Sequence, residues 1–458
     1  MLSNKIKLSY GIGALGKDLA CSIVYIFLMY YYTDVVGIAP AFAGTLFLVA
    51  RMWDAFNDPA MGMIVDNTRT RFGKFRPWIL VGTVLNSIAL IALFTKPSGL
   101  SGNSLYVYTS IVYILWGMTY TVMDIPYWSM IPSLAKTKKD REQIAVIPRV
   151  FASCAWLIMG SFGLSIIGFL GKGDSIKGFS IFAIGIAALF IMSELLVFFN
   201  VKEQVQSENK SEKINLKSAF RMILKNDQLV ALIGTILLFN LMVQLSGGVA
   251  IYYFKYVVGR ENLFSVFTGV SGLAEMGGLL MFPLMASKFG RERLYFLACA
   301  LPIIGFSCLF MSGAVMPQSI IAVAFSGIIA RIGTGFTLGL STVMLADVVD
   351  YGEYKFGTRN ESVVFSVQTL LVKSASAVSG WLIGTGLSLV GYVANVEQTS
   401  ATITGLKVLM IFIPIGLSVV GYIVYKKFYN LHGEYYDGIM EKIKFRNSLD
   451  NLPDHIEV

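Results

Sequence analysis

The chain has 458 residues, of which 55% are hydrophobic and only 14% are charged. Soluble domains carry about 25% charged residues, so this chain has too little charge to cover a surface that faces water. Twelve bilayer crossings of about 20 residues each would use roughly 240 residues, which the length accommodates. The composition therefore excludes a soluble enzyme, a nucleic-acid-binding protein and a disordered chain. The net charge of +9 is what basic cytoplasmic loops of a membrane protein would produce.

Apolar runs long enough to cross a bilayer occur in two groups of six. The first group covers residues 9–34, 40–64, 77–95, 105–134, 145–170 and 178–200. The second covers residues 229–257, 262–287, 294–312, 317–346, 361–391 and 402–425. Basic residues concentrate in alternate loops and in the segment between the two groups. This asymmetry predicts that both termini are cytoplasmic.

The two groups echo each other in sequence. Phe72–Arg76 reads FGKFR after the second run, and Phe289–Arg293 reads FGRER after the eighth. A repeat of six helices predicts an all-α membrane protein of twelve transmembrane helices in two pseudo-symmetric bundles, the architecture of major facilitator transporters. The expected boundaries are an N-terminal bundle at 1–200, a middle loop at 201–228, a C-terminal bundle at 229–427 and a cytoplasmic tail at 428–458.

Charged residues inside the second run are the first candidates for function, because a charge at the bilayer centre costs about 2.5–3.5 kcal/mol on insertion scales. Asp54, Asn57 and Asp58 are spaced i, i+3 and i+4 and so share one helix face. With the hydroxyl of Thr121 they offer hard oxygen ligands, which suit a hard cation. The alternative interpretation is a structural salt bridge between Asp54 and Arg51.

The fourth run carries a second polar stripe. Tyr120, Asp124 and Trp128 recur every four residues, and an aromatic stripe without an acid would indicate packing. Carboxylates, a guanidinium and a flat ring are what a sugar requires, since its hydroxyls need polar partners and its C–H face packs on a ring. Further candidates for this site are Arg149, Lys17 and Asp18. A zwitterionic substrate fits these residue types almost as well.

At these residues the chain resembles the melibiose permeases, cation-coupled sugar symporters of the glycoside–pentoside–hexuronide branch of the major facilitators. The resemblance runs from about residue 8 to residue 430. It is carried by KLSYGIGALGKD (7–18), GTLFLVARMWDAFNDPAMGMIVDNTRTRFGKFRPWIL (44–80), YILWGMTYTVMDIPYWS (113–129) and SVQTLLVKSASA (366–377). Several motifs in the same order make the resemblance specific.

The resemblance implies roles for individual residues. The cation site, for Na⁺, Li⁺ or H⁺, would comprise Asp54, Asn57, Asp58 and Thr121. The sugar site, for a galactoside such as melibiose, would comprise Lys17, Asp18, Tyr120, Asp124, Trp128 and Arg149, with Lys373 from the C-terminal half. It further implies an inner-membrane symporter that works by alternating access, functions as a monomer, needs no cofactor and is not an enzyme.

Three positions depart from the pattern. Leu338 stands where those permeases carry a tryptophan that lines the sugar cavity, which leaves room for another glycoside such as a glucuronide, a pentoside or a raffinose-type oligosaccharide. Glu275 and Arg331 stand where relatives have amides, at similar depth in the eighth and tenth spans. We expect these two to form an ion pair that fills the repeat-equivalent of the N-terminal cation site.

A last group of residues is expected to control gating at the cytoplasmic side. The motif RTRFGKFRPW (69–78) supplies Arg69, Arg71, Lys74 and Arg76. In the other half the expected counterparts are Asp347, Asp350 and Arg359. The sequence contains no nucleophile–base pair or phosphate-binding loop, which argues against a membrane-embedded enzyme.

Overall fold

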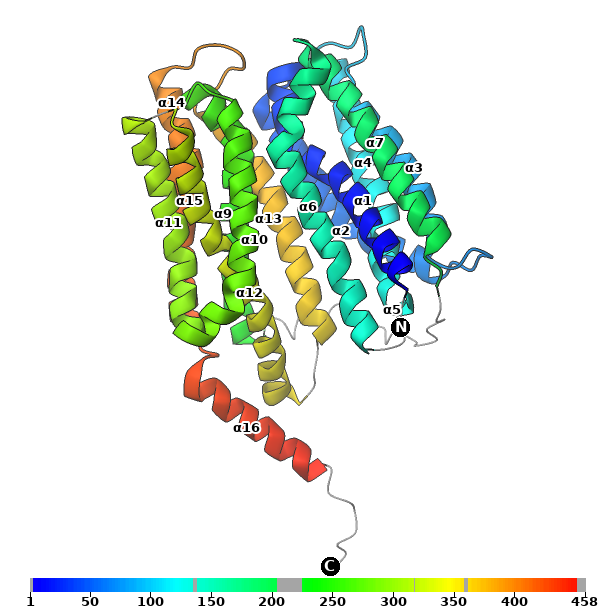
Figure 1. Ribbon diagram of the computed structural model, residues 1–458, viewed down its shortest axis with the longest axis vertical. Helices are drawn as coiled ribbons and strands as arrows, with labels where there is room; N and C mark the ends of the chain where they lie inside the picture. Colours follow the sequence, from blue (N-terminus) through cyan, green and yellow to red (C-terminus); the bar gives the residue numbers. More distant parts are fainter. Residues whose placement is uncertain (1–2, 135–137, 204–224, 317, 358–360, 451–458) are drawn as a thin grey trace, which may run out of the picture. The chain divides into compact units, whose positions relative to one another are not determined.

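The structure is a computed structural model that describes residues 3–134, 138–203, 225–316, 318–357 and 361–450. Within these ranges the regular structure is helical (Figure 1). Most of the predicted middle loop, and Arg359, lie outside the described residues. The chain divides into two compact units, which group residues 1–210, 247–269 and 377–407 in unit 1 and residues 211–246, 270–376 and 408–458 in unit 2.

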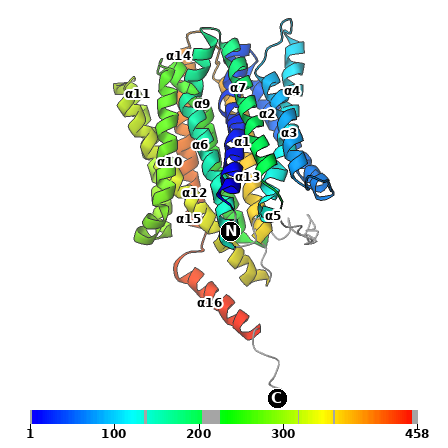
Figure 2. The same ribbon diagram turned by 45° about the vertical axis from the view of Figure 1, so that its right-hand side comes forward.

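Unit 1 is built mainly from the first seven helices. They are α1 (Asn4–Tyr30), continued by the π-helical turn η1 (Tyr31–Val36), α2 (Pro40–Asp66), α3 (Arg76–Leu93), α4 (Asn103–Ser129), α5 (Ile131–Leu134), α6 (Lys138–Gly171) and α7 (Ser175–Asn200). Helix α1 packs against α6 and α7, and α3 packs against α4 and α7 (Figures 1 and 2). Helix α2 lies against α4, which brings the two polar stripes of the sequence onto neighbouring helices.

Small residues set the distance between α1 and α7. A Cβ atom added at Gly16 would overlap the side chain of Ser193, and one added at Gly13 would overlap Val197. Close approach through glycine is the usual device of membrane helices, where packing replaces the hydrophobic effect as the driving force. The glycines of α1 therefore leave little space between these two helices.

Unit 2 holds most of the remaining helices. The second half of the chain forms α9 (Asp227–Tyr252), η2 (Tyr253–Val257), α10 (Asn262–Phe289), α11 (Arg291–Val315), α12 (Ile320–Phe356), α13 (Glu361–Leu389), α14 (Ser400–Lys407), η3 (Val408–Phe412), α15 (Ile413–Phe428) and α16 (Gly433–Asp450). Helix α11 packs against α12 and α15. The buried core of this unit includes Leu294, Leu340, Val348 and Tyr425.

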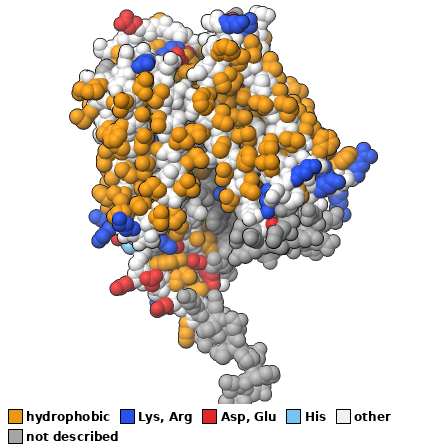
Figure 3. All heavy atoms as spheres, viewed as in Figure 1, with side chains coloured by type: hydrophobic (Ala, Val, Ile, Leu, Met, Phe, Trp, Pro, Cys, Tyr) orange, Lys and Arg blue, Asp and Glu red, His pale blue; other side chains and the backbone are white. Residues whose placement is uncertain are grey.

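Eleven helical segments among the described residues are long and apolar enough to cross a membrane. Helix α2 is a further helix of 27 residues that falls outside this group, and it carries Arg51, Asp54 and Asp58 along its middle. Figure 3 shows hydrophobic side chains along the flanks of the helices and basic side chains near their ends. The predicted all-α membrane fold is confirmed, and the helix that looks least like a span is the one with the candidate cation ligands.

A tight helix contact in unit 2 gives a stability prediction. A Cβ atom at Gly335 on α12 would lie 2.7 Å from the backbone nitrogen of Leu279 on α10, whereas one at Gly277 on α10 would meet nothing within 4 Å. We expect Gly335→Ala to destabilise the protein by about 1–3 kcal/mol through overpacking. The matched control Gly277→Ala should be neutral or slightly stabilising, because alanine is the better helix former. Thermal unfolding in detergent measures the stability of both variants. Equal melting temperatures for Gly335→Ala and Gly277→Ala would contradict this packing.

Candidate substrate and cation site

The candidate sugar site of unit 1 is organised around one buried ammonium group. Lys17, on α1, has a side chain that is only 3% exposed, and its Nζ lies 2.6 Å from Oδ1 of Asp124 on α4. The same Nζ lies 3.4 Å from Oδ2 of Asp18. A buried charge requires such partners because the loss of water is otherwise uncompensated. Two carboxylates on one lysine leave this group with a net charge of −1.

Aromatic side chains enclose the Lys17 ammonium. It lies 4.9 Å from the ring centroid of Trp128 and 5.8 Å from that of Tyr120, within the range of cation–π attraction. The indole of Trp128 also donates a hydrogen bond of 3.0 Å to Oδ1 of Asp124. On the other side Trp156, on α6, donates to Oδ1 of Asp18 at 3.1 Å. No local sequence pattern predicts this contact, because Trp156 and Asp18 are more than a hundred positions apart in the chain.

Five of the six N-terminal residues predicted for the sugar site lie together in this way. Arg149 is the sixth, and its side chain is exposed on α6. Lys373 lies on α13 in a part of that helix that belongs to unit 2. The grouping of the five rests on ion pairs and hydrogen bonds between α1 and α4.

The candidate cation ligands lie on α2 and α4. Oγ1 of Thr121 donates a 3.0 Å hydrogen bond to Oδ1 of Asp58, which joins the two helices. Asp54 accepts a 2.8 Å hydrogen bond from Arg51, the salt bridge that the sequence analysis held as its alternative. The amide nitrogen of Asn57 is buried without a hydrogen-bond partner among the described residues. This face of α2 thus contacts Thr121 through Asp58 and Arg51 through Asp54.

Arg51 is itself held by aromatic rings. Its guanidinium carbon lies 4.9 Å from the ring centroid of Tyr25 and 5.9 Å from that of Trp116. A planar guanidinium stacks well on such rings. The positive charge next to Oδ2 of Asp54 therefore belongs to the protein.

A second polar cluster in unit 1 has no counterpart in the sequence predictions. Its centre is the carboxylate of Asp34 in η1, whose side chain is 1% exposed and lies 2.9 Å from Nζ of Lys255. Tyr392 donates to the same carboxylate at 2.6 Å, and Tyr256 also donates to it. Burial and the charge of Asp34 raise the pKa of Tyr392 far above its usual value, so the phenol stays protonated as a donor. No local sequence motif predicts this cluster, because its residues come from three segments that are far apart in the chain.

The basic loop after α2 is fixed by an acid that the sequence analysis did not single out. Glu203 accepts hydrogen bonds from the backbone N–H groups of Lys74 and Phe75, both at 2.9 Å. A carboxylate at these N–H groups complements the positive end of α3. Gly73 has a φ of +105°, and an added Cβ would overlap the Glu203 side chain, so glycine is required there.

The basic side chains predicted for gating have separate contacts. Lys74 pairs with Asp66 at 2.6 Å, and Arg76 donates to the carbonyl of Phe198 at the end of α7. The guanidinium of Arg71 lies 4.7 Å from the Phe72 ring centroid. Arg69 lies in the loop after α2 with an exposed side chain.

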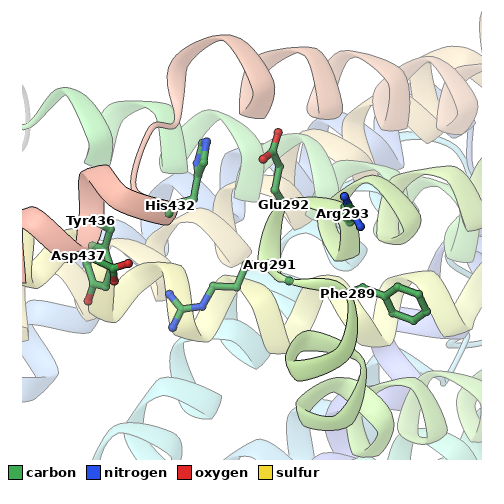
Figure 4. A pocket seen from close by; sticks show the side chains of 9 residues that line it. Phe289, Arg291, Glu292, Arg293, His432, Tyr436 and Asp437 are labelled. Carbon is green, nitrogen blue, oxygen red and sulfur yellow. The ribbon is translucent and has the colours of Figure 1, made fainter.

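In unit 2 the predicted gating acids Asp347 and Asp350 lie on α12 and contact residues of α11 and α16. Asp347 binds Arg291 of the repeated FGRER motif through both carboxylate oxygens, at 2.8 and 3.1 Å. Asp350 accepts a 2.9 Å hydrogen bond from Tyr436 on α16. Arg291 and Tyr436 also line a pocket of about 460 Å³ between the α10–α11 turn and α16 (Figure 4). The repeated motif and the C-terminal helix therefore converge at this end of unit 2.

The residues Glu275 and Arg331 meet between α10 and α12 of unit 2. Nη1 of Arg331 lies 3.4 Å from Oε2 of Glu275, and the hydroxyl of Thr334 donates to the same oxygen at 2.8 Å. The Arg331 side chain is 12% exposed. This geometry is the one that the pairing hypothesis requires.

The described helices are long and apolar enough to cross a membrane, and several of them enclose charged side chains, which defines a multi-pass membrane protein with a polar interior. The model of the MFS/sugar transport protein family matches residues 9–432, and the chain belongs to this family. It is 31% identical over 425 residues to the isoprimeverose transporter of Lactiplantibacillus pentosus, covering 92% of this chain and 88% of that protein. It is 30% identical over 424 residues to the putative glycoside/cation symporter YagG of Escherichia coli K12, covering 91% and 90%.

A solved structure supports the same fold. The crystal structure of a D-xylose-proton symporter superposes with a TM-score of 0.66 at 16% identity, covering 93% of this chain and 98% of that one. The family model and the relatives named above confirm the resemblance to the wider symporter family. Melibiose as the substrate and Na⁺ as the coupling ion stay predictions.

The Glu275–Arg331 contact gives a testable non-additivity. Removing one partner leaves a charge uncompensated between helices, so we expect Glu275→Gln and Arg331→Met each to destabilise the protein by about 3–5 kcal/mol. The double variant should be milder than either single change, because no lone charge remains. A double-mutant cycle on thermal unfolding and on transport measures this. A double variant as damaged as the sum of the singles would refute the pairing.

Proposed function

We propose that the protein is a symporter that imports a glycoside together with a monovalent cation by alternating access. The observation that carries the proposal is the Lys17–Asp124–Trp128 group, in which a buried charge pair lies beside an aromatic face. Membership in a sugar-transport family and the similarity to proteins named as glycoside transporters support it. We further propose a location in the cytoplasmic (inner) membrane with both termini inside, on the distribution of basic loops.

The polar atoms of this group suit sugar hydroxyls. Asp124 has lone pairs beyond those that accept from Lys17 and Trp128, and Asp18 has one oxygen without a hydrogen bond among the described residues. Charge-assisted hydrogen bonds from sugar hydroxyls to these carboxylates are stronger than neutral ones. Trp128 and Tyr120 offer rings for the apolar face of the sugar. A sugar would bind by inserting between groups that now contact each other.

The second part of the proposal concerns the cation. Asp58, Thr121 and the Asn57 carbonyl offer oxygen ligands on the facing sides of α2 and α4, which suits Na⁺, Li⁺ or a proton on the carboxylate. Asp54 would join them once Arg51 moves away. Because α4 carries both Thr121 and Asp124, cation binding at one stripe would align the helix that holds the other.

Coupling between the two sites has to be reciprocal. If the cation tightens sugar binding by some factor, the sugar tightens cation binding by the same factor. One charge that crosses about 100 mV supplies about 2.3 kcal/mol, and a tenfold cation gradient supplies about 1.4 kcal/mol more. Together these support accumulation on the order of 500-fold. The free energy released by one cation per sugar is therefore sufficient to drive accumulation of the sugar.

The cation assignment is tested with Asp58→Asn. In membrane vesicles with a Na⁺ gradient we expect this variant to lose Na⁺-stimulated uptake, because it removes the ligand charge and keeps the side-chain shape. In the unaltered protein, Na⁺ should tighten sugar binding by about 5–150-fold, the usual range of coupling energies. Asp437→Asn, at an exposed carboxylate of α16, is the matched control and should behave as the unaltered protein does. Uptake that keeps its full Na⁺ stimulation in Asp58→Asn would contradict the assignment.

The substrate itself is a separate question that Leu338 raises. Its side chain lies on α12 and is 38% exposed, and an aliphatic residue offers no ring for stacking. A galactoside, a pentoside, a glucuronide and a raffinose-type oligosaccharide are therefore compared as labelled substrates, with Na⁺, Li⁺ or H⁺ as the single gradient. We expect at least one glycoside to be accumulated without cleavage. If none of these glycosides is accumulated, the proposed substrate class is wrong.

A further inference from the structure

One buried carboxyl group of unit 1 belongs to neither candidate site. Glu194, in the second half of α7, has a fully buried side chain with 0% exposure. Neither of its carboxyl oxygens has a hydrogen-bond partner among the described residues. One oxygen lies 3.3 Å from the position that a Cβ atom of Gly13 would occupy, and a ring carbon of Tyr127 lies 3.3 Å from that same position. The carboxyl group is thus enclosed between α1, α4 and α7.

The nearest hydroxyl groups are already committed elsewhere. The rings of Tyr10 and Tyr127 stack with centroids 4.4 Å apart and planes at 1°. The hydroxyl of each tyrosine donates to the backbone carbonyl of the other. These reciprocal bonds use both hydroxyl donors, so neither tyrosine hydrogen-bonds to Glu194.

The nearby cation is committed as well. Lys17 lies 5.4 Å from the ring centroid of Tyr127 and spends its contacts on Asp124 and Asp18. That group already carries a net charge of −1, and an ionised Glu194 would make it −2. The ionisable groups that face Glu194 are Tyr10, Lys17 and Asp18 from α1 and Tyr127 and Asp124 from α4. Of the other elements packed on α7, α3 has its one charge at Arg76, which is bonded to Phe198. The described charged side chains of α6 are Arg149, which is exposed, and Asp140, which pairs with Lys7. The turn η1 has Asp34, which pairs with Lys255.

A buried carboxylate without a donor or counter-ion is strongly unfavourable, and such groups hold their proton instead. We propose that Glu194 is a proton-binding site: it is protonated in this conformation and releases its proton when α1 and α7 separate enough to admit water. The step breaks the carboxyl O–H bond and passes the proton to water. Because the glycines of α1 close the gap to α7, the proton is retained for as long as that contact persists.

The protonation state of Glu194 would act on the sugar site through Lys17. While Glu194 is neutral, Lys17 remains on Asp124. Once Glu194 is ionised, it attracts the same ammonium and weakens the Lys17–Asp124 contact. Glu194 is therefore a positioning residue for the sugar site rather than a ligand of it. This consequence rests on the proposed function, whereas the proton-binding site itself does not.

Infrared spectroscopy of the purified full-length protein tests the proton directly, without any sugar. We expect a protonated-carboxyl carbonyl band at neutral pH that diminishes as the pH is raised to alkaline values. In Glu194→Gln this band should be missing, while the matched control Glu434→Gln, at an exposed carboxylate of α16, should retain it. A spectrum of Glu194→Gln that matches that of the unaltered protein would overturn the proposed proton-binding site.

The effect on the sugar site is tested by the pH dependence of sugar binding in detergent. In the unaltered protein the dissociation constant should rise severalfold from neutral to alkaline pH, because the neutral form of Glu194 is lost as the pH rises. In Glu194→Gln, which mimics the protonated form, that rise should disappear. An unchanged pH profile would overturn the positioning role. Absence of sugar binding in every variant, with the infrared result as expected, would instead count against the proposed function alone.

Discussion

The buried positive charge of Lys17 is the constraint on which the polar interior of unit 1 depends. An ammonium group that is 3% exposed is stable there only because Asp124 and Asp18 flank it and three aromatic rings surround it. Removing either acid leaves the charge less compensated, since a buried ion pair gains its stability from complete pairing. The two acids in turn hold the indoles of Trp128 and Trp156. One lysine thereby fixes side chains from α1, α4 and α6 in a single arrangement.

The need of a buried charge for partners also explains the cluster around Asp34, which differs in kind from the Lys17 group. Here one carboxylate receives donors from Lys255, Tyr256 and Tyr392, so its charge is fully satisfied within the protein. Asn395 adds a hydrogen bond to the backbone carbonyl of Asp34. A group with that many fixed partners has little capacity left for a ligand. The contrast with Asp18 and Asp124, which keep lone pairs, separates a cluster that joins segments of unit 1 from one that is suited to binding.

The sequence predicts the helices well, because apolar length is a local property. It also shows the polar stripes on α2 and α4, since i, i+4 spacing is local too, and their roles as ligands stay predictions. What it misses are contacts between distant segments: Trp156 on Asp18, Lys255 on Asp34 and Glu203 on the loop before α3. For Arg149 the family resemblance predicts a role in the sugar site, but it does not predict the side-chain conformation, and the side chain is exposed in this structure. The Glu275–Arg331 contact was predictable, since depth along two helices of an internal repeat is itself readable from the chain.

Arg51 changes how ion binding at α2 has to be understood. With its guanidinium 2.8 Å from Asp54 and stacked near Tyr25 and Trp116, the protein supplies its own cation to that carboxylate. If the proposed cation binds at Oδ2 of Asp54, it exchanges with this tethered charge. Before any ion binds, Asp54 therefore does not bear the full cost of an isolated buried carboxylate. Because Arg51 and Asp54 lie one turn apart on the same helix, a displaced Arg51 would stay close to this carboxylate and could bind it again once the ion leaves.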